Sequence, residues 1–375
     1  MKKHLLFLFA ALLPMLVSAQ TEVEIEGIYY NLVSKAKIAE VIDKPSGQYR
    51  GVVIIPSTVT YQGTKYTVTR IGTSAFWGDS DLTAITIPTS VTSIGMEAFQ
   101  FCNSLTAINI PKNVTTIEPC AFRCTPNLTT ITVDKENAVF DSRENCNAII
   151  ETSSNTLIAG CSTAFIPKSI KSIGDNAFDG CSNLTTITIP KGVTSIGYAA
   201  FETCTNLTSI TIPESVTNIG YAAFNLCSSL KAFTIPEGVT NIEAHTFFGC
   251  TSLTSIIIPK RVEKIGDLAF ASCTELLDVY CYAENVPMTE NNAFDESYPE
   301  YATLHVPASA LNVYKTTAPW SSFGTIIALT DKEMSIENSE INTQKSTLIY
   351  DLSGRRVEKA EKGIYIIGGK KVVIK

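Results

Sequence analysis

The sequence predicts a β-rich solenoid, in which the chain winds through stacked coils of nearly equal length. The phrase IPKGVTSIGYAAFETC at 189–204 returns as IPESVTNIGYAAFNLC at 212–227. The same spacing separates the prolines within two runs, Pro88 and Pro111, then Pro167, Pro190, Pro213, Pro236 and Pro259. The phenylalanine of a recurring AF pair follows it at Phe76, Phe99 and Phe122, then at Phe178, Phe201, Phe224, Phe247 and Phe270, with Phe294 one residue late. A persistent period of about 23 residues predicts one coil per copy, because leucine-rich repeats have periods of roughly 20 to 29 residues.

Each coil is expected to contain a strand, a corner and a short return. In NLTTITIP at 183–190, Thr186 and Thr188 should face outward, and the apolar positions between and around them should face inward. Pro190 ends this strand because it has no N–H for the ladder, and Gly197 is expected to permit a tight corner. The residues predicted to form the core of this coil are Leu184, Ile187, Ile189, Val193, Ile196, Ala200, Phe201 and Cys204. The predicted fold class is a leucine-rich repeat solenoid of about ten coils, with short turns or 3-10 helices and small β caps at both ends.

The departures from the period predict the domain organisation. Residues 1–19 read as a signal peptide, with Lys2 and Lys3 before an apolar run too short to span a bilayer. An N-terminal β cap is expected at 20–66 and the solenoid at 67–306, with an inserted coil at 134–166 that explains the longer interval between Phe122 and Phe178. A C-terminal cap at 307–330, a polar linker at 331–346 and a small β tail at 347–375 complete the prediction.

Composition favours an exported protein that neither binds nucleic acid nor crosses a membrane. Only 17% of residues are charged, and the formal net charge of -7 gives no general attraction to nucleic acid or anionic lipid. No segment after the leader is long and apolar enough to be a transmembrane segment. We expect a secreted or cell-surface protein that is a monomer.

The sequence contains no recognisable catalytic or metal-binding motif, so we predict no enzyme activity, no metal site and no cofactor. After the leader, the histidines are His245 and His305, which fall in different coils without zinc spacing. Each is interpreted as a satisfied or surface histidine. An alternative is an enzymatic role for the inserted coil, around Asp141, Arg143, Glu144 and Cys146.

Eleven cysteines in an exported chain raise the question of disulfides. Six of them share one position of the coil, where stacked side chains run parallel and do not converge as a disulfide requires; these are Cys102, Cys181, Cys204, Cys227, Cys250 and Cys273. We predict a ladder of buried free thiols. Better candidates for disulfides are Cys120 with Cys124, and Cys146 with Cys161.

The outward strand face is the predicted binding surface, because its small polar residues form a long, weakly charged array suited to an extended partner. Ile257 and Tyr280 are the expected apolar anchors. The central row of this face consists of Thr86, Asn109, Thr132, Thr188, Thr211, Thr234, Ile257 and Tyr280. An alternative is glycan or mucin binding through Tyr198 and Tyr221, which occupy equivalent positions of adjacent coils and should stack if they are exposed.

The repeated phrase L-x-x-I-x-I-P-x-x-V-x-x-I-G-x-x-A-F-x-x-C resembles the BspA-type leucine-rich repeat, also called the Treponema pallidum type, over about 52–306. The inserted coil FDSRENCNAIIETSSNTLIAGC at 140–161, GIYYNL and VPASALNVYK also resemble parts of that family. The ending IYDLSGRRVEKAEKGIYIIGGKKVVIK is similar to C-terminal sorting domains of the type IX secretion route, so the resemblance implies a sorting signal in the tail.

The resemblance implies a bacterial cell-surface or secreted interaction protein, an adhesin or scaffold. Some family members attach bacteria to host matrix proteins such as fibronectin and fibrinogen, or to other bacteria. The implied partner is therefore a protein, either from the extracellular matrix or from another bacterial surface.

Overall fold

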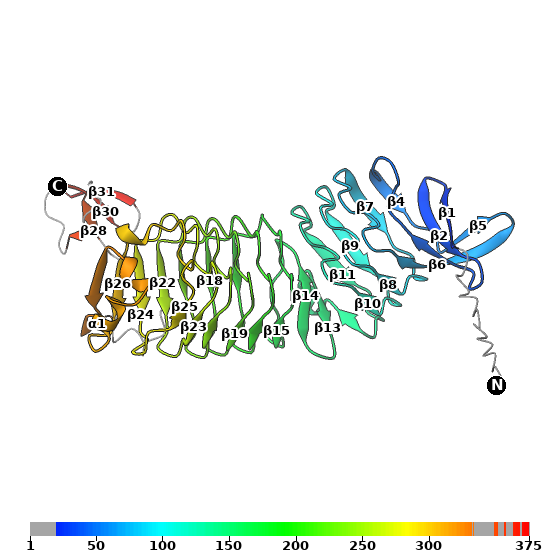
Figure 1. Ribbon diagram of the computed structural model, residues 1–375. Coiled ribbons are helices and arrows are strands. Elements are labelled where there is room, and N and C mark those ends of the chain that lie inside the picture. The colour runs from blue at the N-terminus through cyan, green and yellow to red at the C-terminus, as the bar shows by residue number, and fades with distance from the viewer. Residues whose placement is uncertain are drawn as a thin grey trace, which may run out of the picture. The chain divides into compact units, whose positions relative to one another are not determined.

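The computed structural model describes residues 20–331, 333, 349–351, 356–357, 363–367 and 370–374. The chain divides into two compact units, the first ending at Ala328 and the second beginning at Leu329. The predicted signal peptide at 1–19 lies outside the described residues, as does most of the predicted linker. Figure 1 shows the elements of each unit.

The first unit is a β-solenoid of about 11 turns of roughly 23 residues, which confirms the predicted fold class. Most turns contribute one strand to what we call the front ladder, which is divided into four parallel sheets. Its strands are β4 (Gly51–Ile54), β7 (Leu82–Thr86), β9 (Ala107–Ile110), β11 (Thr130–Val133), β16 (Thr186–Thr188), β18 (Ser209–Thr211), β20 (Ala232–Thr234), β22 (Ser255–Ile258), β24 (Asp278–Cys281), β26 (Thr303–Val306) and β27 (Thr325–Ala328).

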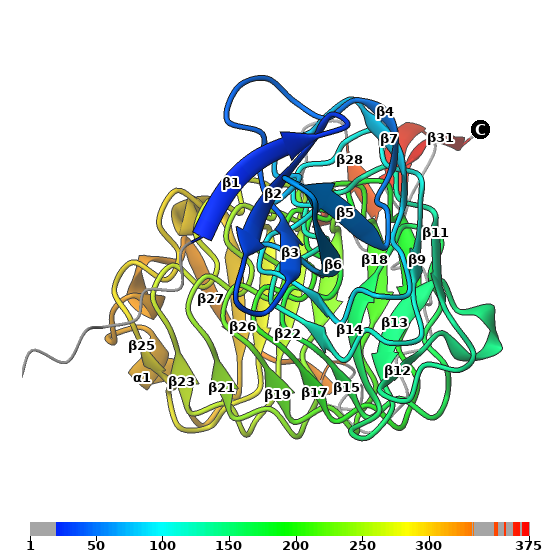
Figure 2. The same cartoon turned by 90° about the vertical axis from the view of Figure 1, so that its right-hand side faces the viewer.

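A second set of short strands, which we call the back ladder, runs along another side of the same turns. Figure 2 shows these strands beneath the N-terminal hairpins. The back ladder consists of β6 (Thr64–Ile71), β8 (Ser93–Ile94), β10 (Thr116–Ile117), β14 (Thr156–Gly160), β15 (Ser172–Ile173), β17 (Ser195–Ile196), β19 (Asn218–Ile219), β21 (Asn241–Ile242), β23 (Lys264–Ile265) and β25 (Met288–Thr289).

Less regular segments flank and interrupt the two ladders. At the N-terminus, β1 (Gln20–Ile25), β2 (Ile28–Val33) and β3 (Ile38–Val41) form an antiparallel meander, and β5 (Thr58–Tyr61) pairs with β6. Toward the C-terminus the short helices are η2 (Pro299–Tyr301), α1 (Leu311–Tyr314) and η3 (Trp320–Ser322). Parallel pairing begins with β3, which pairs with β6, and continues to β27. It therefore crosses both predicted cap boundaries, which remain predictions.

The inserted coil forms a hairpin that interrupts the repeat. It contains β12 (Phe140–Asp141), η1 (Arg143–Asn145) and β13 (Ala148–Glu151), and β13 pairs antiparallel with both β12 and β14. In the second unit, β28 (Ile349–Asp351), β29 (Arg356–Val357), β30 (Gly363–Ile367) and β31 (Lys370–Ile374) form an antiparallel sheet in the order β29-β28-β30-β31.

The core of the solenoid is a stack of phenylalanine rings, because side chains at the same position of successive coils become spatial neighbours. Phe201 and Phe224 are parallel, with ring centroids 5.4 Å apart. The stack runs from Phe76 through Phe99 to Phe122, and then from Phe178 to Phe294, with centroid distances of 5.1–5.7 Å. Within residues 20–331, no ring contact joins Phe122 to Phe178. The inserted coil therefore divides the stack into two runs.

The glycine of the repeat is needed for a different reason from the one predicted. Gly197 does not adopt a positive φ, so it does not serve a left-handed corner. A Cβ atom at this position would lie 2.5 Å from Asp175 Oδ1 and 2.7 Å from the Asp175 backbone nitrogen. The glycine therefore allows one coil to approach the backbone of the previous coil.

The substitution Gly197→Ala is expected to destabilise the solenoid by about 1–3 kcal/mol, because the added methyl group forces neighbouring coils apart. Chemical denaturation of the full chain measures this change. The matched control is Gly192→Ala, where the nearest atoms to a Cβ are carbonyl oxygens at 3.3 Å. Equal losses in the two variants would contradict the proposed role of the close approach.

The cysteine ladder is confirmed, since all eleven cysteines are free and the six in the shared position are buried. Their thiols point at carbonyl oxygens of the preceding coil; for example, Cys227 Sγ lies 3.2 Å from the Phe201 oxygen. The two predicted disulfide pairs are wrong. In the inserted coil, the sulfurs of Cys146 and Cys161 point to the carbonyls of Ala148 and Asn147, and do not bond to each other.

Cys120 and Cys124 are also free thiols. Cys124 lies against the next coil, where its sulfur is 4.0 Å from Asp179 Oδ1 and its backbone nitrogen donates to the Asp179 carbonyl at 3.0 Å. This contact places Cys124 in the coil-to-coil interface.

Candidate interaction site

The predicted binding row lies on the outer surface of the front ladder, with its residues in register. Asn109 pairs with Thr132, Thr188 pairs with Thr211, and Thr234, Ile257 and Tyr280 follow one another on successive strands. The exposed members of the row are Thr86, Asn109, Thr132, Thr188 and Thr211, whereas Thr234, Ile257 and Tyr280 are partly buried.

Along the chain, the row is interrupted at the inserted coil. Thr132 and Thr188 lie on strands of different sheets, and the inserted coil separates them along the chain. Phe165 occupies the equivalent position of the inserted coil, two residues before Pro167 as Thr188 is two residues before Pro190. Thr163, two residues earlier, donates from Oγ1 to the Thr129 carbonyl at 2.5 Å, which holds this segment against the preceding coil. An aromatic ring, 44% exposed, thus lies in the middle of a polar row.

Sequence reasoning missed three members of the row. Ile54 lies at the N-terminal end of the row, where it pairs with Thr86 and is 67% exposed. His305 pairs with Tyr280, and Phe165 fills the inserted coil. Each of the three stands two residues before a proline, as do Thr188 and Thr211. The proline spacing could have identified them if it had been followed through the irregular coils.

The C-terminal end of the row is a compact group of aromatic and apolar side chains. The rings of Tyr280 and His305 stack with centroids 4.2 Å apart. His305 Nε2 lies 2.9 Å from Asp278 Oδ1, and the side chain is 2% exposed. His305 is therefore a buried histidine with an acidic partner, and not a surface histidine. Ile257 and Ile327 extend this group along the face on β22 and β27.

His245 and the candidate residues of the inserted coil have partners within their own part of the solenoid. His245 Nε2 lies 3.8 Å from Asp267 Oδ2, and among the described residues no group of three or more His, Cys, Asp or Glu side chains is arranged to hold a metal ion. In the inserted coil, Arg143 Nη2 lies 2.5 Å from Asp141 Oδ2, which fixes the turn. Burial raises the pKa of the Cys146 thiol, so it stays protonated at neutral pH.

Tyr198 and Tyr221 form an exposed pair elsewhere on the coils. Their rings are parallel with centroids 5.4 Å apart, and the side chains are 49% and 40% exposed. This confirms the prediction that the two tyrosines stack in adjacent coils. The ring of His245 continues the pair at 5.2 Å from Tyr221.

The front ladder thus presents an extended surface, in which polar threonines lie between apolar groups at Ile54, Phe165 and Tyr280. A repeated outer face of this kind on stacked β coils defines the class of leucine-rich repeat proteins. No helix in the described part of the chain is long and apolar enough to cross a membrane.

Comparison with known proteins identifies the family. Residues 69–158 and 159–277, more than half of the chain, match the family described as BspA type leucine rich repeat region, in 6 copies. The chain belongs to this family. No curated protein shows a significant match.

Solved structures of bacterial leucine-rich repeat proteins are similar to the chain. A leucine-rich repeat protein from Bacteroides ovatus is 27% identical with a TM-score of 0.51, and the match covers 82% of this chain and 76% of that one. The pneumococcal vaccine antigen PcpA is 17% identical with a TM-score of 0.50, and the match covers 83% and 99%. A leucine rich cell surface protein from Faecalibacterium prausnitzii is 24% identical with a TM-score of 0.48, and the match covers 70% and 94%.

Proposed function

We propose that this chain is an exported cell-surface interaction protein, an adhesin or scaffold, that binds a protein partner through the outer face of the front ladder. The observation that carries the proposal is the outward row from Ile54 to Ile327, in which polar side chains separate apolar groups. Large or aromatic side chains surrounded by small polar residues are the usual anchors of a protein interface. A long flat sheet suits an extended partner better than a small molecule.

The partner class follows from the chemistry of the face and from the family. The row contains no lysine, arginine or carboxylate, so it favours a partner surface of mixed polarity over a highly charged one. Family membership supports a host matrix protein or another bacterial surface protein. We propose that residues 1–19 direct export and that residues 347–375 contribute to attachment; mass spectrometry of the mature protein from the cell surface would test both.

The substitutions Thr188→Lys and Thr211→Lys together are expected to weaken partner binding by about tenfold or more. Two ammonium groups would then have to be desolvated at the centre of the interface. Surface plasmon resonance of the full chain over immobilised fibronectin, fibrinogen and mucin measures the effect. The matched control is Asn218→Lys with Asn241→Lys, two exposed positions on consecutive strands of the back ladder, β19 and β21.

Three results would count against this function. They are equal losses in the front and back variants, binding to none of the three proteins, and unchanged adhesion of a deletion strain. If the front and back variants lose binding equally, the partner uses another surface.

Glycan binding is the second candidate, favoured by the exposed stacked pair of Tyr198 and Tyr221. Aromatic rings at a surface bind the apolar faces of sugars. A glycan array with the full chain and with Tyr198→Ala separates the two functions. Glycan signals that disappear in this variant, together with unaffected binding of the Thr188→Lys and Thr211→Lys protein to mucin, would favour the glycan function.

A further inference from the structure

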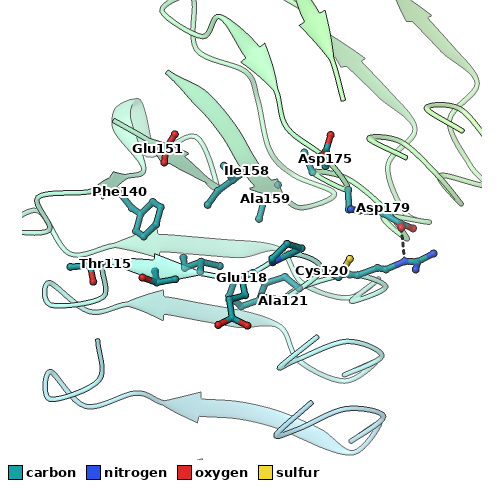
Figure 3. A pocket seen from close by; sticks show the side chains of 18 residues that line it. Thr115, Glu118, Cys120, Ala121, Phe140, Glu151, Ile158, Ala159, Asp175 and Asp179 are labelled. Atoms are coloured by element: carbon teal, nitrogen blue, oxygen red, sulfur yellow. Dashed lines mark ion pairs between the residues drawn. The ribbon is translucent and has the colours of Figure 1, made fainter. Parts of the chain in front are cut away.

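A cavity of about 310 Å³ opens where the inserted coil separates two neighbouring turns. Figure 3 shows Thr115, Glu118, Cys120 and Ala121 on one side of it, and Phe140 and Ile158 on the other. In the first group, Thr115 precedes β10 and the other three residues follow it. Phe140 and Ile158 belong to β12 and β14 of the inserted coil. The cavity is distinct from the front ladder and is not used by the function proposed above.

The cavity runs along the unpaired edge of β10. Among the described strands, β10 pairs only with β8, because β14 is already paired with β13 and β15. In the first regular coil after the insertion, the positions equivalent to Thr115 and Ile117 are Lys171 and Ile173. Their carbonyls accept hydrogen bonds from Thr194 and Gly197 of the next coil, each at 2.9 Å. In the part of the chain described, no backbone group fills this role for Thr115 and Ile117.

The turn after β10 also lacks a backbone hydrogen bond that the regular coils make. The Phe99 amide donates to the Ala121 carbonyl at 2.8 Å, and the Phe178 amide donates to the Ala200 carbonyl at 2.8 Å. For Phe122 the matching acceptor is the Ala177 carbonyl, which instead accepts from the Gly160 amide at 2.7 Å. The residues 115–122 therefore present backbone acceptors and donors to the cavity, and such groups are normally satisfied in native proteins.

The walls of the cavity define what else an occupant must carry. Phe140, Ile158 and Ile117 supply apolar surface. The charged residues that line it are four carboxylates and one guanidinium, Glu118, Glu151, Asp175, Asp179 and Arg123. Arg123 already pairs with Asp179 and Glu202, and Arg70 pairs with Glu118 from outside the cavity. The remaining charge is acidic and favours a basic side chain in the occupant.

We propose that this cavity is a docking site for an extended segment of a partner protein, which adds a strand to the open edge of β10 and carries a basic residue beside apolar β-branched ones. Main-chain hydrogen bonds to the Thr115–Phe122 segment would provide much of the affinity, as in other cases of strand addition. The apolar wall and the acidic rim would select the side chains.

The test uses the full chain and a displayed library of random peptides about twelve residues long, enough for one extended strand and its flanks. We expect enriched peptides to combine a lysine or arginine with valine, isoleucine or threonine. A synthetic copy of an enriched peptide should lose binding roughly tenfold when alternate backbone amides are N-methylated, because N-methylation removes the donors of the added strand. Replacing its basic residue by glutamate should weaken binding as well.

Alkylation of Cys120 provides a way to block the cavity, because Cys120 lines it and is partly exposed. Alkylation with a bulky maleimide under mildly alkaline conditions should abolish peptide binding, and bound peptide should slow the alkylation. The alkaline conditions are needed because burial raises the pKa of the Cys120 thiol. The variant Cys120→Ser, treated in the same way, should retain peptide binding, which controls for reaction at Cys124.

Three outcomes would overturn the proposal. Selection on the unmodified protein could enrich no peptide beyond those selected on the alkylated protein, which would mean that water fills the cavity. Enriched peptides could bind the alkylated and unmodified proteins equally, which would place their site elsewhere. Light scattering could show self-association that alkylation abolishes, which would identify a second copy of this chain as the occupant. Failure of this site would leave the front-ladder function untouched, since the lysine variants of Thr188 and Thr211 test that function separately.

Discussion

Replacing Arg123 by alanine is expected to lower the free energy of unfolding by about 3 kcal/mol, the scale for removing one partner of a buried ion pair. Arg123 Nε lies 2.5 Å from Asp179 Oδ2, and Arg123 Nη2 lies 3.1 Å from Glu202 Oε2. Asp179 is buried, and the two carboxylates belong to the turns after the inserted coil. The substitution leaves two carboxylates close together without their cation, at the place where the phenylalanine stack is divided.

The size of this loss should depend on pH in a definite direction. Burial raises the pKa of Asp179, Arg123 opposes this rise, and the neighbouring Glu202 adds to it. Without Arg123 the pKa of Asp179 in the folded state rises further above its value in the unfolded chain. A carboxyl group with a raised pKa in the folded state binds its proton more tightly when folded, so its stabilising contribution is present at acid pH and is lost as the pH rises. The Arg123→Ala variant should therefore lose more stability near pH 8 than near pH 5.

Urea denaturation of the full chain at both pH values measures the loss. The matched control is Arg50→Ala, which removes an exposed pair with 3.5 Å between Arg50 Nε and Asp81 Oδ2 and should cost less than about 0.5 kcal/mol. Asp179→Asn should cost less than Arg123→Ala, because Arg123 keeps Glu202. Equal effects of Arg123→Ala and Arg50→Ala would contradict the view that the ion pairs of Arg123 with Asp179 and Glu202 stabilise the contact between the two runs of the core.

The regular coils could be predicted from the sequence because every copy supplies the same chemistry at the same position. Leu184, Ile187 and Phe201 are buried as expected, and Thr186 and Thr188 face outward. The burial pattern read from one copy of the repeat therefore predicts that of the neighbouring copies, since stacking in register lets each coil cover the next.

The inserted coil could not be predicted in the same way. Its extra residues form a hairpin, and the pairing of β13 with β14 replaces the hydrogen bonds that β14 would otherwise make to β10. No local pattern in 140–161 signals that loss, because it depends on which strand is already paired. This loss of pairing between β10 and β14 produces both the cavity beside β10 and the division of the phenylalanine stack into two runs.

The candidate binding row was predictable wherever the phrase was intact. Thr188 and Thr211 were found from strand alternation, whereas Phe165 was missed because the inserted coil lacks that alternation. The exposure of Phe165 and the burial of His305 could not be derived at all. They depend on the neighbouring coils, and for His305 on the contacts with Asp278 and Tyr280.

Phe224→Ala is expected to lower the free energy of unfolding by about 3–5 kcal/mol, because the cavity left behind adds to the lost transfer free energy. The ring lies between Phe201 and Phe247, with centroid distances of 5.4 and 5.7 Å, and it also contacts Phe233 at 4.9 Å. Urea denaturation monitored by circular dichroism measures the loss. In a solenoid each coil contacts only its neighbours, so the transition should also broaden or split as the coils on either side of the cavity separate.

Phe165→Ala is the matched control, since it removes the same side chain from a position that is 44% exposed on the front ladder. It should change the free energy of unfolding by less than about 0.5 kcal/mol, the usual range for surface positions, and leave the transition sharp. If the strand-face proposal is right, it should weaken partner binding while Phe224→Ala does not, at temperatures where both variants are folded. Equal stability losses in the two variants would mean that the phenylalanine stack is not what couples one coil to the next.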